Sequence, residues 1–287
     1  MARLPQVILT PSNGTLALVV DVESGQVMRT LAMPPEAVQP KNRPFGIARS
    51  DDGHWFIANN TAVVQLNADL SFKKIWNNLP ENIHQLYYDT EKKSLWVVAT
   101  SIDSLLVINV DSGDMRRFCL LTDSWVAMDT PGADTQHFNS INWAGDQGYV
   151  VAHKFGRTSS FVRTYNRDMR RIALWNVGRE AHNIRLFEGQ MMLLDSRGGR
   201  IVGNQGLEIS VCESHHYARG MIITEEGMAI LSVFAFGTID TRDHGDAMLR
   251  VFDLRSGERV KEIILPGAGN VQDIQLWGRD DGFTKKY

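Results

Sequence analysis

The stretch His137-Phe138-Asn139-Ser140-Ile141-Asn142-Trp143 decides the fold, because its layout recurs along the chain. Polar residues open an alternating run that is typical of a β-strand. A turn follows at Gly145-Asp146, and then a more apolar strand over Tyr149-Val150-Val151-Ala152. The same layout returns at His182-Asn183-Ile184-Arg185-Leu186, again with a histidine and an asparagine at its start. A recurring unit of this kind predicts an array of similar β-sheets.

Five segments share this order of inner strand, hairpin and second strand. Their inner strands begin at Phe45, His84, Asn139, His182 and Arg219. With two further strands each, the units have a period of roughly forty to fifty residues, which is typical of propeller blades.

A tight turn recurs between the outer strands. The pattern Asp/Asn-x-x-Ser-Gly occurs at Asp21 to Gly25, Asn109 to Gly113 and Asp253 to Gly257. Glycine supplies the positive φ that a tight hairpin needs, so these three sites predict hairpins of one kind.

A sixth unit is split between the two ends of the chain. Gln272-Asp273-Ile274-Gln275-Leu276-Trp277 fits an inner strand with no partner after it, and Gln6 to Met33 holds three strands with no inner strand before them. Joining them leaves no open sheet edge in the ring. We therefore predict an all-β, single-domain, six-bladed β-propeller over residues 1–287, with the C-terminal inner strand closing the blade of N-terminal strands.

Composition excludes several classes of protein. The 287 residues carry a formal charge of −3, and the scattered Lys and Arg form no basic stripe for nucleic acid. No apolar run is long enough to span a membrane. With only Cys119 and Cys212, a disulfide framework is not expected. We expect a soluble, cytoplasmic protein that binds neither nucleic acid nor membrane.

The inner strands of a propeller line its axis, so their first polar residues converge at one mouth. Aligning the six strands on their first apolar residue collects seven polar side chains there, and the ends of second strands add two more. The seven are His84, His137, Asn139, His182, Asn183, Arg219 and Asp273, and the two are His153 and Ser196.

The polar residues at this mouth have three possible roles. His84, His137 and His182 come from consecutive blades and would hold Zn²⁺ or Fe²⁺ as three imidazoles with an open position. In the second alternative, Arg219 binds a carboxylate or phosphate and a histidine serves as acid or base. In the third, the polar residues only bind channel water. An arginine and an aspartate beside three histidines favour a functional site over a structural one.

Three segments resemble a known family. Gln136 to Ile141, Ala181 to Arg185 leading to Leu193 to Gly199, and Tyr217 to Met221 resemble an uncharacterised bacterial propeller family. Its members show His-x-Asn, then Pro-His-Ser-Pro-Arg leading to Leu-Leu-Asp-Ser-Gly, then Ala-Arg-Gly. This chain departs from that pattern at Ala181 and Asn183, where the family has Pro and Ser.

The general layout is also similar to NHL-repeat and gluconolactonase-like propellers. Some NHL-type members, such as the peptidylglycine amidating lyase, hold zinc with three channel histidines, whereas gluconolactonase-like members use Glu, Asn and Asp. The histidines of this chain look more like the first group. The resemblance thus implies a propeller fold and is compatible with a metal site.

These observations lead to two hypotheses of function. The first is a small-molecule site with lyase- or hydrolase-type chemistry on an anionic or carbonyl-containing substrate, with or without a metal. His84, His137, His182 and Arg219 would be its catalytic groups. Its substrate-binding groups would be Asn139, Asn183, Asp273, His153 and Ser196. The second is a non-catalytic propeller that binds a protein or peptide. We also expect residues 129–134, just before His137, to cover the top of the axis.

Overall fold

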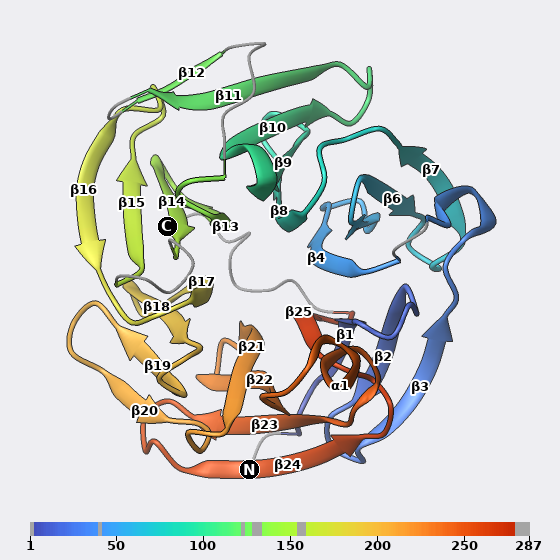
Figure 1. Cartoon of the computed structure of the whole chain (residues 1–287), viewed down its shortest axis with the longest axis vertical. Helices are drawn as coiled ribbons and strands as arrows, with labels where there is room; N and C mark the ends of the chain where they lie inside the picture. Colours follow the sequence, from blue (N-terminus) through green and yellow to red (C-terminus); the bar gives the residue numbers. More distant parts are fainter. Residues whose placement is uncertain (1–2, 40–41, 122–123, 128–133, 154–158, 279–287) are drawn as a thin grey trace.

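The computed structural model describes residues 3–39, 42–121, 124–127, 134–153 and 159–278. Their strands form six antiparallel sheets arranged in a ring around one axis (Figure 1). Inner strands of neighbouring sheets contact one another all the way round, in the order β25, β4, β8, β13, β17, β21 and back to β25. The predicted six-bladed all-β propeller is therefore confirmed.

The blades are numbered by the chain order of their inner strands. Blade 1 contains β4 (Pro44–Arg49), β5 (Trp55–Asn59), β6 (Ala62–Leu66) and β7 (Phe72–Trp76). Blade 2 contains β8 (Ile83–Asp89), β9 (Ser94–Ala99), β10 (Ser104–Asn109), β11 (Met115–Leu121) and β12 (Ser124–Ala127). Blade 3 contains β13 (Phe138–Ala144), β14 (Gln147–Ala152), β15 (Phe161–Tyr165) and β16 (Arg171–Asn176).

The second half of the ring follows the same plan. Blade 4 contains β17 (Ala181–Phe187), β18 (Gln190–Asp195), β19 (Arg200–Gly203) and β20 (Glu208–Ser210). Blade 5 contains β21 (His216–Ile223), β22 (Met228–Ala235), β23 (Ala247–Asp253) and β24 (Arg259–Leu265). Blade 6 contains β25 (Val271–Leu276), β1 (Gln6–Pro11), β2 (Ala17–Asp21) and β3 (Gln26–Leu31).

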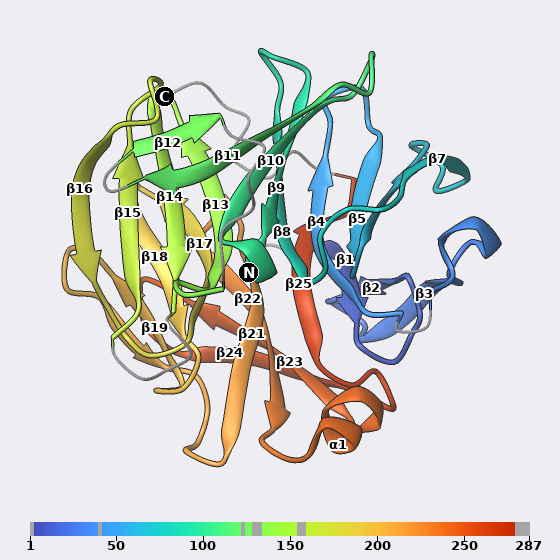
Figure 2. The same ribbon diagram turned by 45° about the horizontal axis from the view of Figure 1, so that its top comes forward.

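Blade 6 joins the two ends of the chain in one sheet. β25 pairs antiparallel with β1, with Val7 opposite Leu276 and Leu9 opposite Ile274. Both views show the C-terminal strand beside the N-terminal ones (Figures 1 and 2). This pairing confirms the predicted closure and satisfies the inner edge of β1, which would otherwise be an unpaired sheet edge.

The three recurring turns have one geometry. Gly25, Gly113 and Gly257 have φ values of 77°, 81° and 74°. Each donates its backbone N–H to the carbonyl of the residue four positions earlier, at 2.8 Å in all three turns. The repeated Ser-Gly pair therefore predicted these hairpins correctly, because the left-handed φ is accessible to glycine without strain.

Four connecting segments contain secondary structure that the sequence pattern did not predict. β12 adds a fifth strand to the outer edge of blade 2, with Phe118 opposite Ala127. The insertion between β22 and β23 contains the short helix α1 (Ile239–His244), and a 3-10 turn, η1 (Pro35–Ala37), lies between β3 and β4. A second 3-10 turn, η2 (Thr100–Ile102), follows β9. Most of residues 129–134 lie outside the described residues, so the predicted cover of the axis can be described only at Asp134.

The core lies between the blades. Between blades 1 and 2, for example, Phe56 and Val63 pack with Val97 and Leu106, all with no exposed surface. Burying one such side chain stabilises the fold by about 1.5–3 kcal/mol. Outer strands such as β3 are mostly exposed, so the apolar residues concentrate on the three inner strands of each blade.

Every inner strand contains an irregularity at the same level. The pairing register shifts within Pro44–Ile47, Ile83–Leu86, Phe138–Ser140, His182–Arg185 and Arg219–Met221, and between β25 and β1 at Leu9–Pro11. Bulges of this kind redirect side chains and often lie beside functional sites. These bulges coincide with the polar residues that the alignment of the six inner strands placed at the mouth.

No helix in the described ranges is long and apolar enough to cross a membrane.

Candidate functional site

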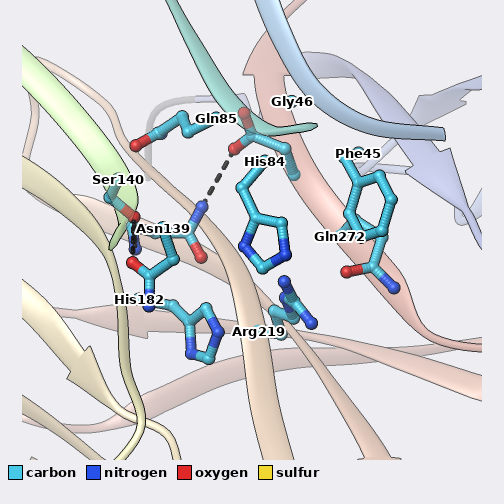
Figure 3. A pocket seen from close by; sticks show the side chains of 11 residues that line it. Phe45, Gly46, His84, Gln85, Asn139, Ser140, His182, Arg219 and Gln272 are labelled. Carbon is cyan, nitrogen blue, oxygen red and sulfur yellow. Dashed lines mark hydrogen bonds between the residues drawn. The ribbon is translucent and has the colours of Figure 1, made fainter. Parts of the chain in front are cut away.

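The six bulges surround one pocket on the axis. Its lining comes from the inner strand of every blade: Phe45, Gly46, His84, Gln85, Asn139, Ser140, His182, Asn183, Arg219, Gln272 and Asp273. Figure 3 shows His84, His182 and Arg219 around one opening, with Phe45 and Gln272 beside them. The predicted convergence of residues that lie far apart in the sequence is therefore present in the structure.

The pocket is narrow. Its cavity volume is about 10 Å³. A space of that size holds about one water. Only glycine fits at position 46, because a Cβ there would lie 2.5 Å from the carbonyl oxygen of His84, so the backbones of β4 and β8 approach closely at the pocket.

Four imidazoles form a row across the mouth. Ring centroids are 5.5 Å apart for His84 and His137, 4.1 Å for His137 and His153, and 5.5 Å for His153 and His182. Phe45 stacks on His84 at 5.0 Å. His153, which was predicted from the end of a second strand, thus lies between two of the three histidines that were predicted as metal ligands.

His137 is held by two carboxylates. Asp103 accepts the backbone N–H groups of Thr135, Gln136 and His137, at 2.6, 2.8 and 3.0 Å. Asp134 contacts Nδ1 of His137 at 3.1 Å. The backbone of His137 has a φ of 53°, a left-handed value that costs energy for a residue with a Cβ. Asp103 therefore stabilises the backbone that presents this imidazole.

His182 is oriented by a buried hydroxyl. Its Nδ1 lies 2.9 Å from Oγ of Ser196, which has no exposed surface. The ring of Tyr217 lies 6.0 Å from the imidazole ring of His182. Ser196 was predicted as a substrate-binding residue, and the structure places it behind His182, where it orients the imidazole.

All four imidazoles are held in the neutral form. Burial lowers the pKa of His84 and His182 well below 6.5, and the charge of Arg219 lowers it further. Burial, His137 and Arg219 together lower the pKa of His153 to about 3. Burial also lowers the pKa of His137, although Asp134 opposes that shift. Neutral imidazoles can donate one hydrogen bond, accept another or bind a metal.

Arg219 forms no ion pair with a carboxylate of the described residues, although the charge of Asp273 acts on it from farther away. Within the described part of the chain its Nε is buried without a hydrogen-bond partner. Burial lowers the pKa of Arg219 to about 10, and Arg242 and Arg43 add to that shift. The guanidinium is charged at neutral pH all the same. A buried charge without a partner is costly, so such a residue is usually kept for a ligand.

Buried polar side chains around the same pocket form a group that we call the waist cluster: Asn139, Ser140, Asn183, Arg185 and Asp273. Oδ1 of Asp273 accepts hydrogen bonds from Asn183 at 3.0 Å and Arg185 at 3.2 Å, and its Oδ2 accepts the backbone N–H of Ile47 at 3.0 Å. Burial raises the pKa of Asp273, and Arg185 opposes the shift.

Hydrogen bonds also link the asparagines of the waist cluster to neighbouring blades. Oδ1 of Asn183 accepts the N–H of Gly220 at 2.9 Å, and Nδ2 of Asn139 donates to the carbonyl of Ala181 at 2.8 Å. Both side chains line the pocket as predicted. Their amide groups, like the carboxylate of Asp273, are also occupied by bonds that hold the ring together.

The side chains at the mouth have donor atoms that suit a metal, but they are not arranged as a preformed metal site. Neutral imidazoles are suitable ligands, and Asp134 on Nδ1 of His137 resembles the carboxylate that orients many metal-binding histidines. Yet the described residues contain no group of three or more His, Cys, Asp or Glu side chains placed to hold an ion. His137 and His153 are the nearest pair, with ring centroids 4.1 Å apart, so His153 competes for the place that a three-histidine site of His84, His137 and His182 would need.

Sequence reasoning missed Arg185, Tyr217 and Asp103. Arg185 follows Asn183 by two positions, so strand alternation alone would have put both on one face. Tyr217 precedes Arg219 by the same spacing. Asp103 carried no such signal, because its role depends on a loop contact between β10 and the segment before β13.

No protein-family model matches this sequence, and none of the curated proteins does. Solved structures share the fold. A protein of unknown function from Bacteroides caccae is similar with a TM-score of 0.69 and 12% identity, over 96% of this chain and 100% of its own. A chain of a nidogen/laminin complex is similar with a TM-score of 0.66 and 12% identity, over 95% of this chain and 98% of its own. Dihydro-heme d1 dehydrogenase NirN is similar with a TM-score of 0.54 and 11% identity, over 96% of this chain and 76% of its own.

Identities this low show the fold alone. The propeller that the sequence predicted is confirmed by these structures. The narrower resemblance to NHL-repeat and gluconolactonase-like proteins is not carried by them.

Proposed function

We propose that the axial mouth binds a small anionic molecule and that its imidazoles catalyse a lyase- or hydrolase-type step on it. The observation that supports this most directly is Arg219, a half-buried arginine whose Nε is itself buried and lacks a partner within the described residues. A carboxylate would supply both the missing charge and the missing acceptor, since Arg matches carboxylates with paired N–H groups.

Neutral histidines around that anion suit acid–base chemistry. Arg219 lowers the pKa of His84, His153 and His182 through its positive charge. An anion on Arg219 offsets that charge, so the imidazole pKa values rise toward the working range of a general base. Binding would thus prepare the catalytic groups, with Ser196 holding His182 in place and Asn139 and Asn183 lining the pocket.

Calorimetry tests the anion site. Propionate is titrated into the wild-type protein, Arg219→Gln and Arg29→Gln, a control at an exposed position on β3. We expect Arg219→Gln to weaken binding at least tenfold and the control to leave it unchanged. Titrations at about pH 6 in buffers of different ionisation enthalpy should show net proton uptake by the wild type. Equal affinity in all three proteins would overturn the proposal.

Catalysis is tested separately. Proton NMR follows a mixture of small lactones, esters and hydroxy acids with the wild type, His182→Asn and His244→Asn. We expect turnover that falls at least a hundredfold in His182→Asn and persists in His244→Asn, an exposed position on α1. Propionate binding without turnover of any compound would favour the alternative, a non-catalytic propeller that binds an acidic protein or peptide segment.

A divalent metal, Zn²⁺ or Fe²⁺, is the second candidate for this mouth. It is supported by the row of four neutral imidazoles and by the resemblance to zinc-holding NHL-type propellers. Bound to His84, His137 and His182, it would polarise a carbonyl group or acidify a water. Metal analysis of the purified protein tests this, with stoichiometric metal expected in the wild type and absent in a His137→Ala/His182→Ala double variant.

We further propose a cytoplasmic location. Its support is that Cys119 and Cys212 are free thiols, and Cys119 is buried. Thiols persist in reducing compartments.

A further inference from the structure

An aromatic patch adjoins the mouth on blade 5. The Tyr217 ring lies 6.0 Å from the ring of His182, 5.4 Å from Phe234 and 6.1 Å from Phe236. The guanidinium of Arg197 lies over Phe236 at 4.4 Å. Aromatic rings therefore extend outward from the row of histidines.

Phe236 is 51% exposed, and Tyr217 is 8% exposed. The backbone N–H of Phe236 donates to the carbonyl of His215 at 2.9 Å, which fixes the chain that bears the ring. Exposed apolar surface beside a polar pocket is typical of a ligand site. Full burial of a phenylalanine side chain is worth about 1.5–3 kcal/mol, so a ligand ring covering Phe236 would gain part of that energy.

The patch lies at a short distance from the proposed anion site. Tyr217 and Arg219 are two residues apart on β21, which separates their backbones by about 6.6 Å. Opposite them on β22 stand Phe234 and Ser232. An anionic group on Arg219 and a planar group on Tyr217 or Phe236 would therefore belong to one small molecule.

We infer that the substrate of the mouth is an arylalkanoic acid, whose carboxylate enters the narrow pocket at Arg219 and whose ring lies outside the pocket on the exposed Phe236. This inference rests on the proposed anion site. Aromatic pairs in stacked or edge-to-face contact add about 0.5–1.5 kcal/mol beyond the area they bury. Arg197 already contacts Phe236, and its positive charge near the ring favours an anionic ligand over a cationic one.

The test compares carboxylates that differ only in the group they carry. Calorimetry measures the affinities of propionate, benzoate, phenylacetate, 3-phenylpropionate and 3-cyclohexylpropionate for the wild type. We expect phenylacetate or 3-phenylpropionate to bind at least tenfold more tightly than propionate. The cyclohexyl compound should be weaker than its phenyl counterpart, because it lacks the π contact.

Two variants locate the ring. Phe236→Leu keeps an apolar side chain and should remove at least fivefold of the phenyl advantage while propionate affinity is unchanged. Phe72→Leu is the matched control, since Phe72 is 38% exposed on β7 of another blade, and it should retain the full advantage. Saturation-transfer NMR should show stronger effects on the ring protons than on the alkyl protons.

The outcomes separate the two proposals. Propionate that binds through Arg219, without a phenyl advantage that depends on Phe236, would overturn the arylalkanoic acid and leave the anion site standing. Failure of every carboxylate to bind would overturn both. Equal phenyl advantage in Phe236→Leu and Phe72→Leu would place the ring elsewhere and overturn the inference.

Discussion

The side-chain amide of Asn183 donates to Oδ1 of Asp273 at 3.0 Å, although the two residues lie on blades 4 and 6 and are 90 positions apart. Arg185, also on blade 4, reaches the same oxygen. These contacts join blades that do not pair with each other in any sheet. The waist cluster thus connects blades 4 and 6, which are separated by blade 5, at the centre of the ring.

Asp273→Asn should destabilise the protein by about 3–5 kcal/mol, because it leaves the buried charge of Arg185 without its partner. The new amide would also present N–H groups to donors such as the backbone of Ile47. Urea unfolding measures the loss. Asp111→Asn changes an exposed carboxylate paired with Lys93 and should cost at most about 0.5 kcal/mol. Similar stability in the two variants would contradict this role for Asp273.

The two arginines of the axis should respond to substitution with opposite signs. Arg219→Met removes a charge that pairs with no described carboxylate, so we expect the free energy of unfolding to rise by about 1 kcal/mol. Arg185→Met removes the partner of Asp273 and should lower it by about 3 kcal/mol or more. Urea unfolding of both proteins checks the signs. A loss of stability in both would mean that Arg219 is a structural residue.

Stability should fall as the pH is lowered below about 6.5. Burial lowers the pKa of His153 in the folded protein to about 3, so the unfolded chain takes up a proton first. The free energy of unfolding is therefore lost across the window from about 6.5 down to about 3, by up to about 1.4 kcal/mol per pH unit for each such histidine. Urea unfolding at about pH 7, 6 and 5 measures the slope.

His153→Asn should reduce this slope, and His84→Asn and His182→Asn should do so as well, since burial lowers their pKa values too. His244→Asn, at an exposed position, controls for the substitution itself. An unchanged slope in all three mouth variants would show that other groups cause the acid sensitivity.

Asp103→Ala should release the segment before β13. It removes the acceptor of three consecutive backbone N–H groups and of the Thr135 hydroxyl, at a cost of about 1–3 kcal/mol. Hydrogen exchange should become faster at the amides of residues 135–137 and change little in β9 and β10. Asp111→Ala is the surface control. Unchanged exchange at His137 would mean that Asp103 does not hold this part of the backbone.

Much of the ring could be predicted from sequence because each blade repeats the same local signals. The Ser-Gly turns and the alternating inner strands are short-range features, and the unpaired strand at each end of the chain implied the closure. β12 was missed because its four residues follow β11 with no recurring pattern. The short helix α1 was missed because it lies in an insertion that no other blade repeats.

For the site, the sequence predicted which residues lie together at the mouth. Alignment of the inner strands brought His84, His182 and Arg219 together, but it could not show the bulges that orient their side chains. It also could not show that Asn183 and Asp273 bond to each other across the axis or that His153 stands between His137 and His182. Those relations depend on the distance across the ring, which has no counterpart in sequence spacing.

The pairing of β25 with β1 sets a delay during synthesis. The N-terminal strand emerges from the ribosome first, yet the strand that covers it begins only at Val271. At typical translation rates of about 5–20 residues per second, this interval lasts on the order of 10–50 s. During this interval the inner edge of β1 is unpaired and can pair with strands of other nascent chains. Chaperone assistance at that stage should decide how much of the newly made protein escapes aggregation.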